Sequence, residues 1–122
     1  MGFRDWFRKR TASRVESRIE FIHEQDGENE RRLKAQLLPL LVEAPHIQRA
    51  YLARAGFQPA DATSVVLCLI STTGADESLI QRLGELFPKI VPPNVFLDIA
   101  FLTDAQEEDV ARVCPPFYRR AS

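Results

Sequence analysis

The feature that most constrains the fold is a continuous apolar run in the middle of the chain, from Val65 to Ile70. Every side chain in it is apolar, so the run offers no polar face. The run is short and is followed by a turn-forming stretch, Thr72–Gly74, which favours a strand over a helix. We therefore predict a central strand that is buried on both faces of a sheet.

Hydrophobic residues on either side of this run repeat with alternating strand and helix periods. The order is strand, helix, strand, strand, helix, strand, helix. It predicts an α+β fold with a four-stranded mixed sheet and helices mainly on one face. The predicted strands are 15–23, 47–56, 64–71 and 94–102, and the predicted helices are 28–44, 76–87 and a short one after Thr103. Pro88 is expected to end the second helix, and Thr103 with Gln106 to begin the third as a capping box.

The size and composition of the chain agree with one domain. A chain of 122 residues with 45% hydrophobic side chains is able to bury a sizeable core without disulfides or metals. Cys68 and Cys114 are far apart in sequence and lack the spacing of metal ligands, so we expect reduced structural thiols. There is no signal-peptide pattern and no apolar run of about 20 residues, so the expected location is the cytoplasm.

Residues 1–14 are predicted to form a basic leader ahead of a domain that spans residues 15–122. The first 18 residues carry six basic side chains against two acidic ones, whereas the rest of the chain has ten basic and fifteen acidic ones. Phe3, Trp6 and Phe7 recur at helical spacing next to Arg8, which predicts a short basic amphipathic helix. Such a helix suits weak, reversible docking to a membrane surface or a partner groove. The alternatives are packing on its own domain, disorder at the terminus, or one helix through residues 3–23.

Three short motifs accompany this order of elements. They are the strand segment Ala50-Tyr51-Leu52-Ala53, Asp98 within an otherwise apolar strand, and the ending Pro116-Phe117-Tyr118. With them, residues 17–120 resemble the C-terminal domain of the enhanced serine sensitivity protein SseB. This resemblance implies a bacterial, cytoplasmic domain with no established catalytic chemistry.

The same motifs supply the candidate binding residues, which are Tyr51, Asp98 and Tyr118. A buried carboxylate needs partners. Asp98 is therefore an acid or a ligand anchor, or else a carboxylate that lies at a sheet edge or pairs with an arginine such as Arg49 or Arg54. The two tyrosines would line a pocket, or would pack their rings and keep their hydroxyls in water. The leader side chains Phe3, Trp6, Phe7 and Arg8 are the candidate docking residues.

Several classes of chemistry find no support in the sequence. His23 and His46 have no third ligand at a useful spacing, so no metal site is expected. Cys114 has no identifiable base for nucleophilic catalysis. Ser71–Gly74 has one glycine and no lysine, so it matches neither a phosphate loop nor a dinucleotide fingerprint. We expect no cofactor, and no nucleic-acid binding, because the basic residues beyond the leader form no stripe with aromatic side chains.

These observations predict a non-enzymatic protein-binding or regulatory module of the SseB C-terminal-like type, whose partner is another protein or a second copy. The alternative is a small-molecule sensor that binds an amino acid or a similar metabolite as an oligomer. An open sheet edge would favour the protein-binding module. A concave pocket with Tyr51 and Asp98 pointing into it would favour the sensor.

Overall fold

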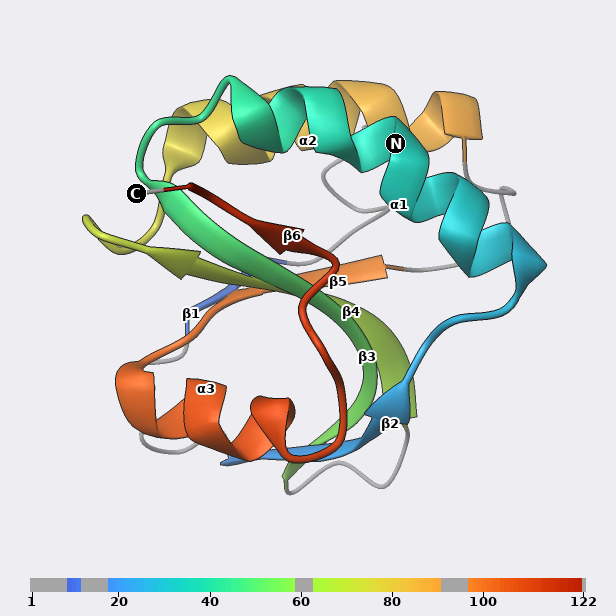
Figure 1. Ribbon diagram of the computed structural model, residues 1–122, viewed down its shortest axis with the longest axis vertical. Helices are drawn as coiled ribbons and strands as arrows, with labels where there is room; N and C mark the ends of the chain where they lie inside the picture. The colour runs from blue at the N-terminus through green and yellow to red at the C-terminus, as the bar shows by residue number, and fades with distance from the viewer. Residues whose placement is uncertain (1–8, 12–17, 59–62, 91–96, 122) are drawn as a thin grey trace.

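The computed structural model describes residues 9–11, 18–58, 63–90 and 97–121 (Figure 1). Their elements follow the predicted order, and the α+β class is confirmed. In chain order they are β1 (Lys9–Thr11), β2 (Arg18–Glu24), α1 (Glu28–Val42), β3 (Ile47–Gln58), β4 (Thr63–Ser71), α2 (Glu77–Ile90), β5 (Leu97–Phe101), α3 (Asp104–Ala111) and β6 (Tyr118–Arg119). Within these ranges no helix is long and apolar enough to cross a bilayer.

The described strands form one mixed sheet in the order β1-β5-β4-β3-β2, with β6 also paired to β3. β1, β5 and β4 are parallel, whereas β3 is antiparallel to β4, β2 and β6. The four predicted strands are β2, β3, β4 and β5. The short strands β1 and β6 are additions that hydrophobic periodicity alone did not reveal, because two or three residues are too few to show a period.

The central position of β4 is confirmed. Residues 66–70 are all buried, and their side chains alternate between the two faces of the sheet. Leu67 and Leu69 belong to the core beneath α1 and α2, whereas Val66 and Cys68 belong to the core beneath α3. Figure 1 shows α1 and α2 on one side of the sheet and α3 on the other. The helices therefore lie mainly on one face, as predicted.

The face beneath α1 and α2 is filled by large aliphatic side chains. The stripe of α2 consists of Leu79, Leu83 and Phe87, which recur every fourth residue and are almost fully buried. The prediction that Pro88 ends this helix is wrong, because α2 continues to Ile90. A proline at this position removes one hydrogen bond of the helix, and only Lys89 and Ile90 follow it within α2.

The face beneath α3 is filled by smaller side chains. Val110 of α3 and Cys114 just after it pack on this face. The sheet residues beneath them are mainly alanine, valine and cysteine: Ala53, Ala55, Val66, Cys68 and Ala100. The predicted capping box is confirmed, since the Thr103 hydroxyl accepts from the Gln106 amide and the Gln106 side chain accepts from the Thr103 amide.

The leader is only partly described. Lys9–Thr11 form β1, which pairs with Ile99–Phe101 of β5, so the predicted helix is wrong at these three residues. Pairing with β5 satisfies backbone groups that would otherwise lie open at the sheet edge, which explains the preference for a strand. A single helix through residues 3–23 is also wrong, because residues 18–24 are β2. Phe3, Trp6, Phe7 and Arg8 lie outside the described residues.

Candidate functional site

Tyr51 of β3 is held in a polar cluster with Arg49 and Glu107. Its ring is buried at 3% exposure beneath α3, and its hydroxyl donates to Glu107 Oε2 over 2.7 Å. Arg49 donates to the same carboxylate through both Nε and Nη2, the latter reaching Oε1 over 2.9 Å. This two-pronged contact connects the middle of the sheet to α3, and it is the geometry that arginine and carboxylate prefer.

The electrostatics of this cluster favour one fixed protonation state. Hydrogen bonds from Arg49 and Tyr51 hold the pKa of Glu107 below its usual value, against the effect of its burial. Burial and the hydrogen bond to Glu107 raise the pKa of Tyr51 to about 12. At neutral pH the cluster therefore consists of an ionised carboxylate, a guanidinium and a neutral phenol. The Tyr51 hydroxyl is therefore engaged by Glu107.

Asp98 lies on the same face of the sheet as Tyr51 but is not beside it. It is 1% exposed and is opposite Val66 on β4, whereas Tyr51 is opposite Cys68, two residues further along β4. Strand β4 therefore separates the two side chains. The expected arginine partners are placed elsewhere, because Arg49 binds Glu107 and Arg54, by strand alternation, lies on the α1–α2 face.

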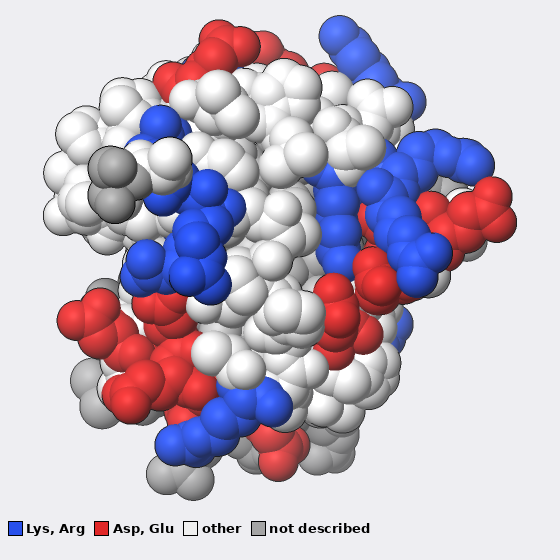
Figure 2. All heavy atoms as spheres, in the orientation of Figure 1, with Lys and Arg blue, Asp and Glu red and all other residues white. Residues whose placement is uncertain are grey.

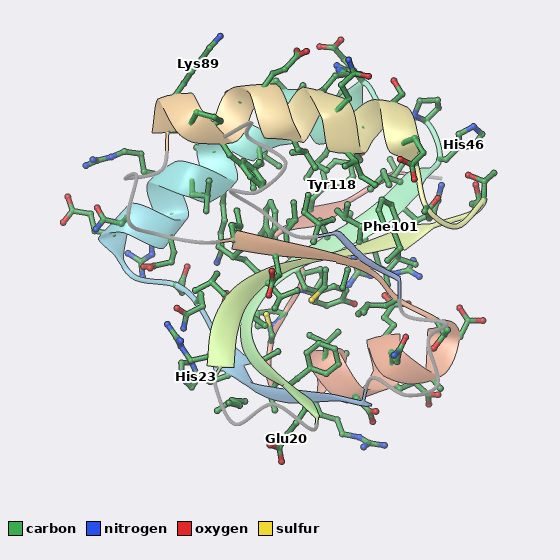
Figure 3. All side chains as sticks on the ribbon, turned by 180° about the vertical axis from the view of Figure 1, so that it is seen from behind. Glu20, His23, His46, Lys89, Phe101 and Tyr118 are labelled. Atoms are coloured by element: carbon green, nitrogen blue, oxygen red, sulfur yellow. The ribbon has the colours of Figure 1, made fainter. Side chains whose placement is uncertain are left out.

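Tyr118 of β6 belongs to the opposite face from Tyr51. Its half-buried ring packs against the core beneath α1 and α2, as Figure 3 also shows. The Arg120 guanidinium lies 5.8 Å from the centre of this ring. Tyr51, Asp98 and Tyr118 therefore do not converge on one site, although the sequence motifs had grouped them.

A second charged cluster, which the sequence analysis missed, joins α1 to β2. Lys34 is only 8% exposed and donates to Glu24 over 3.1 Å and to Asp26 over 2.9 Å. Its ammonium group also lies 5.9 Å from the ring centre of Phe117. Burial lowers the pKa of Lys34, but the two carboxylates outweigh this effect and raise it. Lys34 follows the helical spacing of the α1 core, at three residues before Leu37, and this position was a signal for its burial.

Arg120 fixes the C-terminal segment to the end of α1. Its Nη2 donates to the carbonyl oxygens of Leu41 and Ala44 over 3.0 and 2.6 Å, and its Nε donates to Ile47 over 2.8 Å. The last carbonyls of a helix lack partners within the helix and carry partial negative charge. The guanidinium satisfies them and holds β6 against β3.

β6 and β2 together cover the outer edge of β3, the side away from β4. Three successive outward carbonyls of β3, at Gln48, Ala50 and Leu52, accept from the backbone amides of Arg120, Phe117 and Gln25. β2 pairs with the rest of the strand from Ala53 to Gln58. The two segments run in the same direction along β3, so they form one composite edge. Among the described residues, no strand pairs with the outer side of this β2–β6 edge.

The surface around this edge has a distinct charge pattern. Figure 2 shows two groups of mixed basic and acidic side chains, separated by a band without charge. The segment that leads from α3 to β6 runs through the middle of this view in Figure 1, and it contains Pro115, Pro116 and Phe117. An uncharged band between charged groups is a common surface for contact with another chain.

The histidines and thiols form no reactive centre within the described ranges. His23 and His46 lie at different ends of the molecule in Figure 3. In that part of the chain, no group of three or more histidine, cysteine or acidic side chains is arranged to hold a metal. Burial raises the pKa of Cys68, and it raises the pKa of Cys114 to about 11. Both thiols are therefore protonated at neutral pH.

Comparison with known proteins agrees with the resemblance in the sequence. The family model described as the SseB protein C-terminal domain matches residues 22–120, which includes every described element except β1 and the start of β2. No curated protein and no solved structure matches the chain. Because the family model covers most of its length, the chain belongs to the SseB C-terminal domain family.

Proposed function

We propose that this domain is a non-catalytic protein-binding module that accepts an extended segment of a partner at the β2–β6 edge. The observation that carries the proposal is the contrast between the two sides of this edge. Its inner side is fully used by β3, whereas its outer side has no partner strand among the described residues. Strand addition at an open edge supplies main-chain hydrogen bonds, and alternate side chains give specificity.

The positions of the candidate residues favour this module over a small-molecule sensor. A sensor needs a few polar side chains that converge on one cavity. Here Tyr51 binds Glu107, Tyr118 packs on the opposite face, and Asp98 lies across β4 from Tyr51. The β2–β6 edge requires no such convergence, because backbone groups do the binding.

The chemistry of the titratable groups supports a role without catalysis. The nucleophilic form of cysteine is the thiolate, and burial disfavours it at both Cys68 and Cys114. Arg49, Tyr51 and Glu107 satisfy one another, and each is held in its resting charge state. Catalytic acids and bases generally have pKa values near the working pH.

A second contact is proposed at the other edge of the sheet. β1 attaches the leader beside β5, whereas the β2–β6 edge lies beyond β3, so the two contacts do not compete for one strand. Phe3, Trp6, Phe7 and Arg8 would make a weak peripheral contact with an anionic membrane surface. The fluorescence of Trp6, the only tryptophan, should then shift to the blue with anionic vesicles, and less so in high salt. A spectrum that ignores vesicles would contradict this contact.

The edge itself is tested with a display library of random ten-residue peptides. Ile22 is 41% exposed, and the irregular register of β2 leaves it without a partner residue in β3. Proline is tolerated at bulges, so Ile22→Pro should keep the fold, and its fixed φ should alter the backbone of the open edge enough to weaken strand addition. We expect selected peptides to bind the Ile22→Pro variant about tenfold more weakly than wild type.

Ile22→Val is the matched control, because it keeps the backbone amide and most of the side chain. It should bind the selected peptides as wild type does. A library that yields no binder, or binders that do not distinguish Ile22→Pro from Ile22→Val, would overturn the edge as the binding site. A cooperative chemical melt of each variant checks that the fold is intact.

A further inference from the structure

Two arginines face each other across the β3–β6 pair. Arg49 of β3 and Arg119 of β6 are direct partners in the antiparallel register, so their side chains leave the sheet on the same face. Like charges in this arrangement destabilise a sheet unless a counter-charge compensates them. The fold therefore needs an acidic group near this pair.

Glu107 supplies that counter-charge, but only for one of the two arginines. Its carboxylate is bound by Arg49 and by the Tyr51 hydroxyl. Arg119 is exposed and makes no hydrogen bond or ion pair with any described residue. Its charge nevertheless reaches the cluster, since it contributes to the lowered pKa of Glu107. Two positive charges thus stand near one carboxylate that binds only Arg49, so one positive charge is left at the surface of the β2–β6 edge.

The junction between β2 and β6, in the middle of the same edge, has no such excess. There Lys34 and Arg31 face Glu24 and Asp26, so two basic groups meet two acidic ones. A partner segment that lies along this edge meets a balanced cluster near the middle, beside Glu24, and an uncompensated arginine on β6. A charge requirement is therefore expected at the position of the partner opposite β6.

We infer that the segment bound at this edge carries an aspartate or glutamate directly opposite Arg119. The inference rests on the proposed function, because it requires a strand beside β6. A residue opposite Arg119 on such a strand has its side chain on the same face, with the two Cβ atoms about 5 Å apart. At that separation a carboxylate reaches the guanidinium and forms a charge-assisted pair. Arg49 stays bound to Glu107, so its positive charge is also held close to the carboxylate of the partner.

The random-peptide library tests this requirement directly. Peptides selected on wild-type protein should share one acidic residue at a fixed position relative to their apolar residues. Selection on Arg119→Glu should replace it with lysine or arginine at that position. Replacing the shared acid by its amide should weaken binding to wild type about three- to tenfold, and less in high salt. Arg32→Glu, a charge reversal on the exposed side of α1, is the control and should select the wild-type motif.

The outcomes separate the two proposals. Peptides that need the open edge but share no acidic residue, or keep it on Arg119→Glu, would overturn the inference and leave the binding edge intact. A library without binders would overturn both. A second copy of the chain is the competing occupant, and sedimentation would reveal it as a dimer that Ile22→Pro dissociates. That result would overturn the assignment to a partner segment.

Discussion

The two faces of the sheet are built on different principles. Beneath α1 and α2, leucines from both helices and from the sheet fill the interior, and Phe87 completes it. Beneath the single eight-residue helix α3, the sheet presents mainly small side chains, with Tyr51, Ile70 and Phe21 as the larger ones. The first face is stabilised by the burial of apolar surface. The second adds a fixed polar contact, from Arg49 and Tyr51 to Glu107, to its smaller apolar core.

This difference shows how a chain of this size uses its charged residues. A short helix on alanines buries little area, so a directional contact is needed to fix its position. Two longer helices on leucines need no such contact between their buried surfaces, and Lys34 sits at the margin of that core. Substitutions on the two faces should therefore differ in size and in their dependence on pH.

The largest expected effect is on the leucine-filled face. Leu67→Ala, at the centre of β4, should lower the free energy of unfolding by about 2–5 kcal/mol, because it leaves a cavity in a closely packed core. Cys68→Ala, the next residue and on the other face, should cost only about 1 kcal/mol for the loss of one heavy atom. Urea melts of both variants measure the difference. Equal losses would mean that the two faces are packed alike.

A smaller effect is expected at the margin of the same face. Lys34→Ala should cost about 1.5–3 kcal/mol, since it removes two hydrogen bonds to carboxylates in a largely buried position. Arg31→Ala removes an exposed contact to Asp26 and should cost less than about 1 kcal/mol. If the two variants melt alike, the Lys34 cluster contributes no more than an ordinary surface ion pair.

The sequence predicted the elements that depend on apolar periodicity and failed where contacts are specific. The run from Val65 to Ile70 was sufficient to place β4 at the centre, and Thr103 with Gln106 to place the start of α3. β6 could not be predicted, because two residues have no periodicity. Arg120 determines its position through carbonyl groups at the end of α1, and such contacts leave no pattern in a sequence.

The candidate site was predicted only as separate residues. Tyr51, Asp98 and Tyr118 were selected because each stands in one of the three motifs that resemble the family. To decide whether they share a site, one must know on which face of the sheet each side chain lies. Strand alternation gives that face only once the register of the strands is known. Glu107 carries no distinct signal in the sequence, because the helix dipole accounts for acidic residues in a first turn but gives no sign of a partner 58 residues away.

The third prediction concerns the contribution of the α3 face to stability at acidic pH. The pKa of Glu107 is lowered in the folded protein, so the contribution of its ionised form is present above about pH 4.5 and is lost as the pH falls further. Arg49→Gln should therefore be less stable than wild type by about 1 kcal/mol at neutral pH, and the difference should shrink as the pH falls below about 4.5. Urea melts at neutral and at acidic pH measure this. A deficit that persists in acid would mean that Arg49 acts through packing.

The smallest effect is expected from the Tyr51 hydroxyl, and it reports on the polar contact most directly. Its pKa is raised from 10.0 to about 12, so its contribution to stability is complete below pH 10 and is lost as the pH rises through 12. Tyr51→Phe should cost only about 0.5–1.5 kcal/mol at neutral pH, because Arg49 still binds the carboxylate. The near-ultraviolet absorbance of phenolate follows this ionisation, and the Tyr51→Phe variant should lose a step near pH 12. If the variant instead loses a step near pH 10, the hydroxyl is open to water, and α3 is then held to the sheet by Arg49 and apolar contacts without Tyr51.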